Sequence, residues 1–132
     1  DDSRKNSVHE NKAANNAKGI YLTYNSNDNY LKGNIVSDNE KGLCLANHSG
    51  NNTVINNNAQ ENGYGIYLSF SACWNLVFEN HLIDNGYNAY DMGRNNAWDN
   101  GTIGNYYSDL GRIFYVPGGK SVDKYPMVVV GE

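Results

Sequence analysis

The chain has 132 residues, enough for a single domain, with a formal net charge of −4 and 18% charged residues. An acidic chain without a basic stripe cannot neutralise a phosphate backbone, so we expect no nucleic-acid partner. No stretch approaches the ~20 apolar residues of a membrane span, and we expect none. Asn occurs 24 times, but at fixed spacings, so its abundance does not predict disorder.

A 23-residue repeat organises the chain from its start. Complete copies begin at Gly19, Gly42 and Gly65, and residues 6–18 match the second half of another copy. A fixed period of this length is typical of stacked units that bury their apolar sides against one another. Three Asn columns keep their register: Asn6, Asn29, Asn52, Asn75; Asn11, Asn34, Asn57, Asn80; and Asn16, Asn39, Asn62, Asn85.

Each copy predicts three short strands. Its first residues alternate, which places Ile20 and Leu22, and their equivalents in later copies, on one face of a strand. Two further apolar columns are Val8, Leu31, Val54, Val77 and Ala13, Val36, Ala59, Leu82. Asn flanks both columns and suits corners, because it tolerates left-handed backbone angles. With no helical period, the pattern predicts an all-β chain, a right-handed parallel β-helix with coils ~4.8 Å apart.

The Asn columns then have a structural role. Identical amides stacked at a corner can each donate to the next and accept from the one before, which forms a ladder. A buried amide without a partner costs ~1–3 kcal/mol, so we expect these ladders to stabilise the fold. The alternative, that Asn only marks loops, does not explain three columns in register.

The pattern weakens after Asn88. Ala89 and Asp91 occupy the positions of Ile and Leu, and Trp98 falls in the position of a column Asn. We therefore expect coils over residues 1–97, the first incomplete, and a C-terminal cap over residues 98–132 that blocks edge-to-edge pairing. The uncovered first coil predicts self-association, and a start at mid-repeat suggests a piece of a longer protein. Cys44 and Cys73 sit at different repeat positions and are expected to be free thiols.

Three segments carry a resemblance to a known family. They are Gly19–Asn29 (GIYLTYNSNDN), Trp98–Asp109 (WDNGTIGNYYSD) and Val122–Met127 (VDKYPM). Together they resemble the NosD-type β-helix proteins, which are often labelled periplasmic copper-binding proteins and belong to a wider class of carbohydrate-binding and sugar-hydrolase β-helices. The resemblance implies a location outside the cell or in its envelope.

The copper label requires clustered His, Cys or Met side chains. His9, His48 and His81 fall at different positions of the repeat, and Met92 and Met127 are single. We therefore expect no metal site and no other cofactor.

An enzyme of this class needs a pair of acids about 5–10 Å apart. The best candidates are Asp38 and Glu61, one coil apart beside an Asn column and joined by Glu40, with Asp84 slightly out of phase. A lyase would need a base near bound acids, and Arg94 beside Asp91 is the nearest equivalent, although that pair also suits a salt bridge. A solvated acidic corner explains the acids as well.

More residues of the sequence support a carbohydrate-binding surface. Tyr21, Cys44, Tyr67 and Tyr90 form the outward column of the first strand, and Tyr64, Tyr87, Tyr24 and Phe70 flank it. Aromatic rings on a flat sheet offer faces on which sugars stack, but they also stabilise each other across strands. The sequence therefore predicts a non-catalytic structural or carbohydrate-binding module, with polysaccharide as the candidate partner. The alternative is the C-terminal part of a polysaccharide lyase, epimerase or hydrolase whose active site lies upstream.

Overall fold

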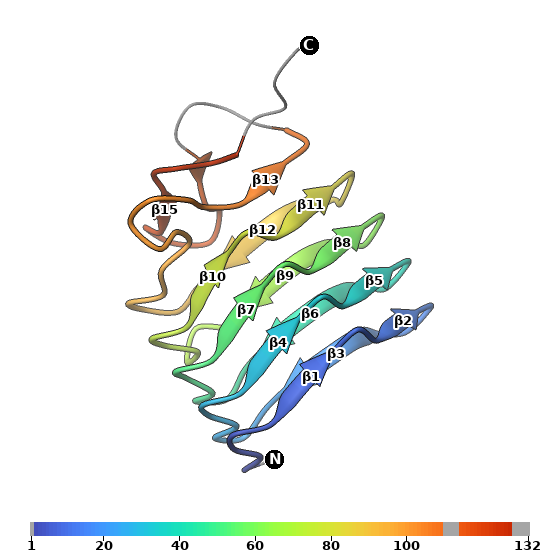
Figure 1. The fold of residues 1–132 in the computed structure, drawn as a ribbon, viewed down its shortest axis with the longest axis vertical. Helices are drawn as coiled ribbons and strands as arrows, with labels where there is room; N and C mark the ends of the chain where they lie inside the picture. The colour runs from blue at the N-terminus through green and yellow to red at the C-terminus, as the bar shows by residue number, and fades with distance from the viewer. Residues whose placement is uncertain (1, 110–113, 128–132) are drawn as a thin grey trace.

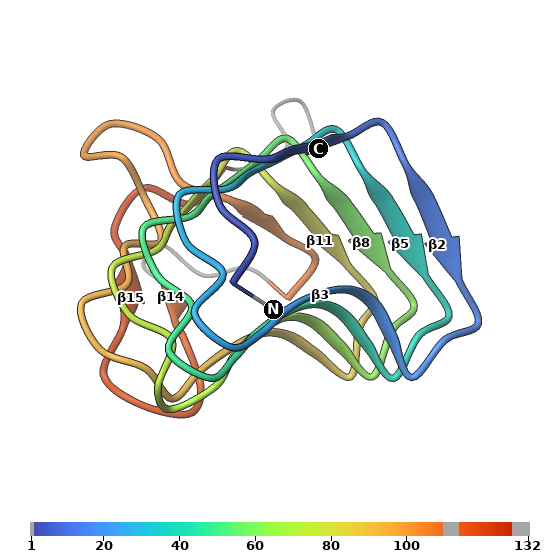
Figure 2. The ribbon, with the colours of Figure 1, turned by 90° about the horizontal axis from the view of Figure 1, so that it is seen from below.

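The chain folds into a stack of coils, each built from three short strands (Figure 1). The computed structural model describes residues 2–109 and 114–127, and this part of the chain contains no helix. Followed from the N-terminal end, the chain turns clockwise as it recedes from the viewer, so the coil is right-handed (Figure 2). The predicted right-handed parallel β-helix is confirmed.

Three parallel sheets form the walls of the solenoid. The first contains β1 (Ser7–His9), β4 (Tyr30–Lys32), β7 (Thr53–Ile55) and β10 (Leu76–Phe78). The second contains β2 (Lys12–Ala14), β5 (Ile35–Ser37), β8 (Asn58–Gln60), β11 (His81–Ile83) and β13 (Tyr106–Tyr107). The third contains β3 (Lys18–Leu22), β6 (Lys41–Leu45), β9 (Tyr64–Leu68) and β12 (Tyr87–Asp91). Near the C-terminus, β14 (Phe114–Tyr115) pairs antiparallel with β15 (Val122–Asp123).

The predicted apolar columns form the interior. Leu31, Val54 and Val77 pair in register and are fully buried, as are Val36, Ala59 and Leu82 in the second sheet. Stacked apolar side chains of successive coils remove one another from water, and this burial is the main favourable contribution to folding.

The Asn columns form continuous ladders. In the middle ladder, the backbone N and the Nδ2 of Asn34 both donate to Asn57 Oδ1, at 2.9 Å and 2.9 Å. Asn57 repeats this pattern toward Asn80, and its Nδ2 also donates to the carbonyl of Leu31 at 3.0 Å. The bonds from one ladder Asn to the next all run toward the C-terminal end, so each ladder has a direction.

We expected the ladder Asn at each of these corners to have a left-handed backbone angle. The residue before the ladder Asn has that angle instead. The φ angles of Glu10, Asn56 and Glu79, which precede Asn11, Asn57 and Asn80, are 55°, 56° and 58°. Side chains as different as Lys5 and Trp74 also have positive φ before a ladder Asn. The corners are therefore not selected by the intrinsic preference of Asn for left-handed angles. The two amide bonds from each coil to the next hold the preceding residue in this conformation.

The ladders extend further than the 23-residue period indicates. The spacing predicted Trp98 in an Asn column, and this prediction was wrong. The last coil is two residues shorter there, so Asn96 takes the column position and accepts from Asn75. Trp98 follows Val77 in the apolar column instead and is fully buried. A longer insertion follows, and it brings Asn105, 25 residues after Asn80, into the middle ladder.

Each ladder ends on an aspartate. Asn96 donates to Asp91, Asn105 to Asp123, and Asn88, which extends the third ladder, to Asp109. This follows from the direction of the ladders, since the last amide presents N–H donors and a carboxylate only accepts. Asp91 lies in the interior position of a Leu and is fully buried, with further bonds from Trp98 Nε1 and Ser121 Oγ.

Aromatic side chains close the C-terminal end of the core. Tyr107 occupies the column of Leu82 and stacks on Phe114, with ring centroids 3.8 Å apart. Its hydroxyl donates to Asp123 at 2.8 Å, and burial together with this carboxylate holds the pKa of Tyr107 well above its usual value. Residues 110–113 and 128–132 of the expected cap lie outside the described residues.

Candidate functional site

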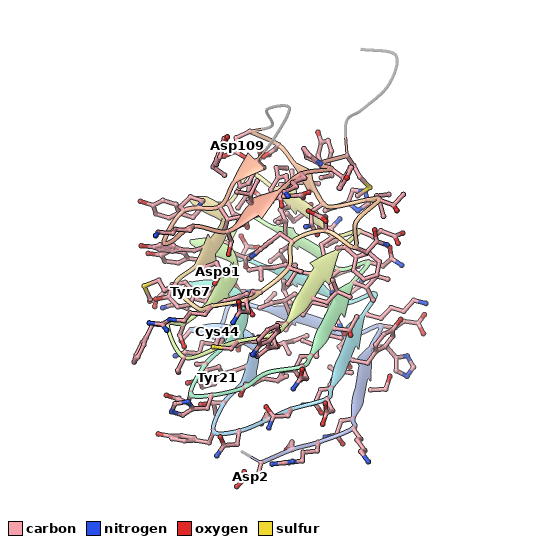
Figure 3. The ribbon with its side chains drawn as sticks, turned by 90° about the vertical axis from the view of Figure 1, so that its left-hand side faces the viewer. Asp2, Tyr21, Cys44, Tyr67, Asp91 and Asp109 are labelled. Carbon is pink, nitrogen blue, oxygen red and sulfur yellow. The ribbon has the colours of Figure 1, made fainter. Side chains whose placement is uncertain are left out.

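The outward face of the third sheet carries two neighbouring columns of side chains. One column is Tyr21, Cys44, Tyr67 and Tyr90, and the other is Lys18, Lys41, Tyr64 and Tyr87. Figure 3 shows Tyr21, Cys44 and Tyr67 following one another up the stack. Tyr21, Tyr67 and Tyr90 lie between interior positions of their strands and so point away from the core.

Four tyrosines of the two upper coils touch one another. We call Tyr64, Tyr67, Tyr87 and Tyr90 the tyrosine cluster. Tyr64 stacks on Tyr87 with centroids 5.2 Å apart, and its ring meets that of Tyr67 edge-on at 4.9 Å. Tyr90 lies 5.5 Å from Tyr67 and 5.3 Å from Tyr87. Such distances are those of favourable aromatic pairs, so the rings hold each other in place.

Lys41 borders the cluster on the coil below. Its Nζ lies 4.9 Å from the ring centroid of Tyr67 and 5.5 Å from that of Tyr64, and 3.5 Å from the Glu40 carboxylate. Desolvation raises the pKa of Tyr67, and the charge of Lys41 opposes this effect. Lys41 was not among the residues predicted from the sequence, although its position 23 residues before Tyr64 places it in the same column.

Cys44 separates Tyr21 from the cluster. The register confirms the outward column, but the side chain of Cys44 is only 2% exposed. Burial raises the pKa of its thiol to about 11, against the opposing charges of Lys41 and Lys18. Tyr21 contacts Lys18 instead, whose Nζ lies 4.9 Å from its ring. The structure thus brings together four of the six candidate tyrosines, Tyr64, Tyr67, Tyr87 and Tyr90. Both cysteines are free, as expected.

The candidate acids form an exposed corner. Asp38 and Glu61 have φ angles of 56° and 57°, and both side chains point into solvent. Asp84 is in phase with them, not out of phase as we expected, because Ser37, Gln60 and Ile83, which precede the three acids, pair in register. Among the described residues, no buried group pairs with the carboxylates of these three acids. The geometry of this corner therefore supports no catalytic step.

Arg94 and Asp91 do not form the expected pair. Asp91 is buried and bonded to the cap, Arg94 is exposed, and the described residues contain no ion pair between them. The three histidines lie apart, with His9 on β1, His48 after β6 and His81 on β11.

Comparison with known proteins gives one match. The family described as "Periplasmic copper-binding protein (NosD)" matches residues 1–111. The chain belongs to the NosD family. This assignment confirms the resemblance, and the family's description agrees with a location outside the cytoplasm. No curated protein and no solved structure matches the chain. No helix among the described residues is long and apolar enough to cross a membrane.

The NosD description implies copper, and the described side chains do not fit it. Copper sites combine several His, Cys or Met ligands in one cluster. Among residues 2–109 and 114–127 no three His, Cys, Asp or Glu side chains come together in a way that could hold a metal ion. Cys44 is an unsuitable ligand, because burial raises the pKa of its thiol to about 11 and so keeps the thiol protonated. Its two lysine neighbours lower this pKa, but their charge repels a cation.

Proposed function

We propose that this NosD-family β-helix is a non-catalytic module of a cell-surface or envelope protein that binds polysaccharide on its tyrosine cluster. The supporting observation is the mutual contact of four tyrosines on the outward face of a rigid parallel sheet. Tyr87 is 49% exposed, so its ring is open to a ligand. Aromatic rings with polar tips suit sugars, which present apolar ring faces surrounded by hydroxyl groups.

The geometry favours weak, cumulative binding. Each ring contact contributes ~0.5–1.5 kcal/mol beyond the area it buries, so several together reach the ~4 kcal/mol of a millimolar complex. A polysaccharide repeats the same unit, and neighbouring units raise the effective concentration at the surface. Because the ladders and the core fix the sheet, little conformational entropy is lost on binding.

Tyrosine fluorescence tests this proposal. Soluble polysaccharides at millimolar sugar concentration should quench the emission of the wild-type chain. Tyr67→Ala and Tyr87→Ala should each weaken binding by about three- to tenfold, as expected for the loss of one ring contact. The matched control is Tyr30→Ala, since Tyr30 is 40% exposed on the first sheet and lies outside the cluster.

Circular dichroism must show that each variant keeps the fold. If the cluster variants bind as tightly as Tyr30→Ala and the wild type, the four rings serve only to stabilise neighbouring coils, and the module is a scaffold.

A further inference from the structure

An open groove lies between the last coil and the C-terminal cap. One wall is the loop Gly93–Asn96 after β12, and the other is the segment Gly119–Val122 with Lys124. Its volume is about 890 Å³, within the range of small-ligand sites. Both walls belong to the region beside Asp91 (Figure 3), since Asn96 and Ser121 each donate to that carboxylate.

The groove concentrates positive charge. Arg94, Lys120 and Lys124 all line it, in a chain with only 10 Lys and Arg and a net charge of −4. All three side chains are exposed, and within the described residues none forms an ion pair with a carboxylate. Three cations around one concavity supply positive groups for an anionic ligand.

The acids nearby are already engaged. Asp91 and Asp123 are fully buried, and each accepts several hydrogen bonds from the ladder ends and the cap. Asp99 accepts from the backbone N of Lys124 and of Gly101. These carboxylates hold the cap in place, and the cations face the open groove.

Aromatic side chains lie near both walls of the groove. One coil below, Trp74 is 64% exposed and its backbone N donates to the carbonyl of Arg94. Gly118 precedes the wall residue Gly119 and lies close to the tyrosine cluster, since a Cβ at Gly118 would be 3.1 Å from Cδ1 of Tyr90. Aromatic rings are therefore close to the cations of the groove.

We propose that this groove binds the carboxylate or sulfate groups of an acidic polysaccharide. The inference rests on the proposed function and names the class of glycan that the module prefers. Arg94 pairs with the planar anionic group in a two-pronged contact, and Lys120 and Lys124 act as point charges. The sugar rings then extend toward Trp74 or the tyrosine cluster.

Matched pairs of glycans test the proposal. Dextran sulfate should bind at least about tenfold more tightly than dextran at low ionic strength, and polygalacturonate more tightly than its methyl ester. The variant Arg94→Gln/Lys120→Gln/Lys124→Gln should remove this preference. Each neutralised charge should weaken binding by about fivefold, from the ~1 kcal/mol of two charges 4 Å apart in water. The single variant Lys120→Gln replaces an exposed side chain without an ion pair among the described residues and should retain the fold.

The control variant is Arg4→Gln/Lys5→Gln/Lys12→Gln, which loses one Arg and two Lys from exposed positions of the first coil. It should keep the preference for the sulfated chain. Equal loss in both triple variants, or no preference of the wild type for charged glycans, overturns the inference. Weaker dextran binding in Tyr67→Ala with an unchanged sulfate preference separates the two sites. If the groove variants bind dextran sulfate as tightly as the wild type does, only the proposed function stands.

Discussion

Replacement of Asn57 by Leu removes one amide from the centre of the middle ladder at almost constant volume. Asn34 N loses its acceptor, Asn34 Nδ2 keeps only the carbonyl of Val8, and the carbonyl of Leu31 loses the Asn57 donor. Asn80 Oδ1 keeps the backbone N of residue 57. The variant thus leaves several buried polar groups with fewer partners.

The magnitude follows from these bonds. An orphaned buried N–H costs ~1–3 kcal/mol. Each of the three other lost bonds, one from Asn34 Nδ2 and two from Asn57 Nδ2, costs ~0.5–1.5 kcal/mol. Burial of the leucine methyl groups returns about 1 kcal/mol. We expect a loss of about 4 kcal/mol in the free energy of unfolding. With a urea slope of ~1–3 kcal/mol per molar, the midpoint falls by roughly 1–4 M.

Asn58→Leu is the matched control, because it makes the same substitution at the next residue. Asn58 faces outward in β8, and its Oδ1 is buried without a partner among the described residues. Leucine removes this unsatisfied acceptor, so the midpoint should stay or rise. Equal losses in both variants, or an unchanged midpoint for Asn57→Leu, would refute the ladder argument.

Three further predictions concern the thiols, the cap and the first coil. At pH 8 a thiol reagent should label Cys73 readily and Cys44 only on unfolding, since the Cys44 thiol is buried with a pKa of about 11; equal rates would contradict this. Burial raises the pKa of Asp123 above 3.8, so the folded chain binds this proton more tightly than the unfolded chain. The resulting stability is present below pH 3.8 and is lost as pH rises through the folded pKa, and Asp123→Asn should remove this slope from urea melts. Finally, β1, β2 and β3 are edge strands of the three sheets, and unpaired edges promote pairing between chains. Light scattering of the 132-residue chain should therefore show self-association. A strict monomer at high concentration would contradict this prediction.

The repeat predicted the coils because each position has the same neighbours above and below. The apolar columns and the Asn columns could therefore be assigned from spacing alone, from Val8 to Leu82. A fourth column was overlooked: Ser3, Ser26 and Ser49 are also 23 residues apart. The backbone N of Ser3 donates to the Ser26 hydroxyl, and that of Ser26 to the Ser49 hydroxyl. The same spacing argument would have found it.

The end of the solenoid could not be derived from the period. Asn96 follows Asn75 by 21 residues and Asn105 follows Asn80 by 25, so both ladder positions depart from the 23-residue period. Strict counting therefore placed Trp98 in the wrong column. The carboxylates at the ladder ends follow from the direction of the hydrogen bonds, which becomes apparent only when the coils are stacked. The basic groove joins segments from the last coil and the cap, and no spacing rule connects Arg94 with Lys120.

If the tyrosine cluster binds polysaccharide, its four rings change their environment together when a glycan is added. NMR spectra of the chain with ¹³C-labelled tyrosine rings, recorded during titration with an oligosaccharide, test it most directly. We predict that the ring signals of Tyr64, Tyr67, Tyr87 and Tyr90 shift together with one binding constant, while those of Tyr30 and Tyr115 stay in place. Unshifted cluster signals at saturating glycan, or shifts confined to tyrosines outside the cluster, would contradict the account.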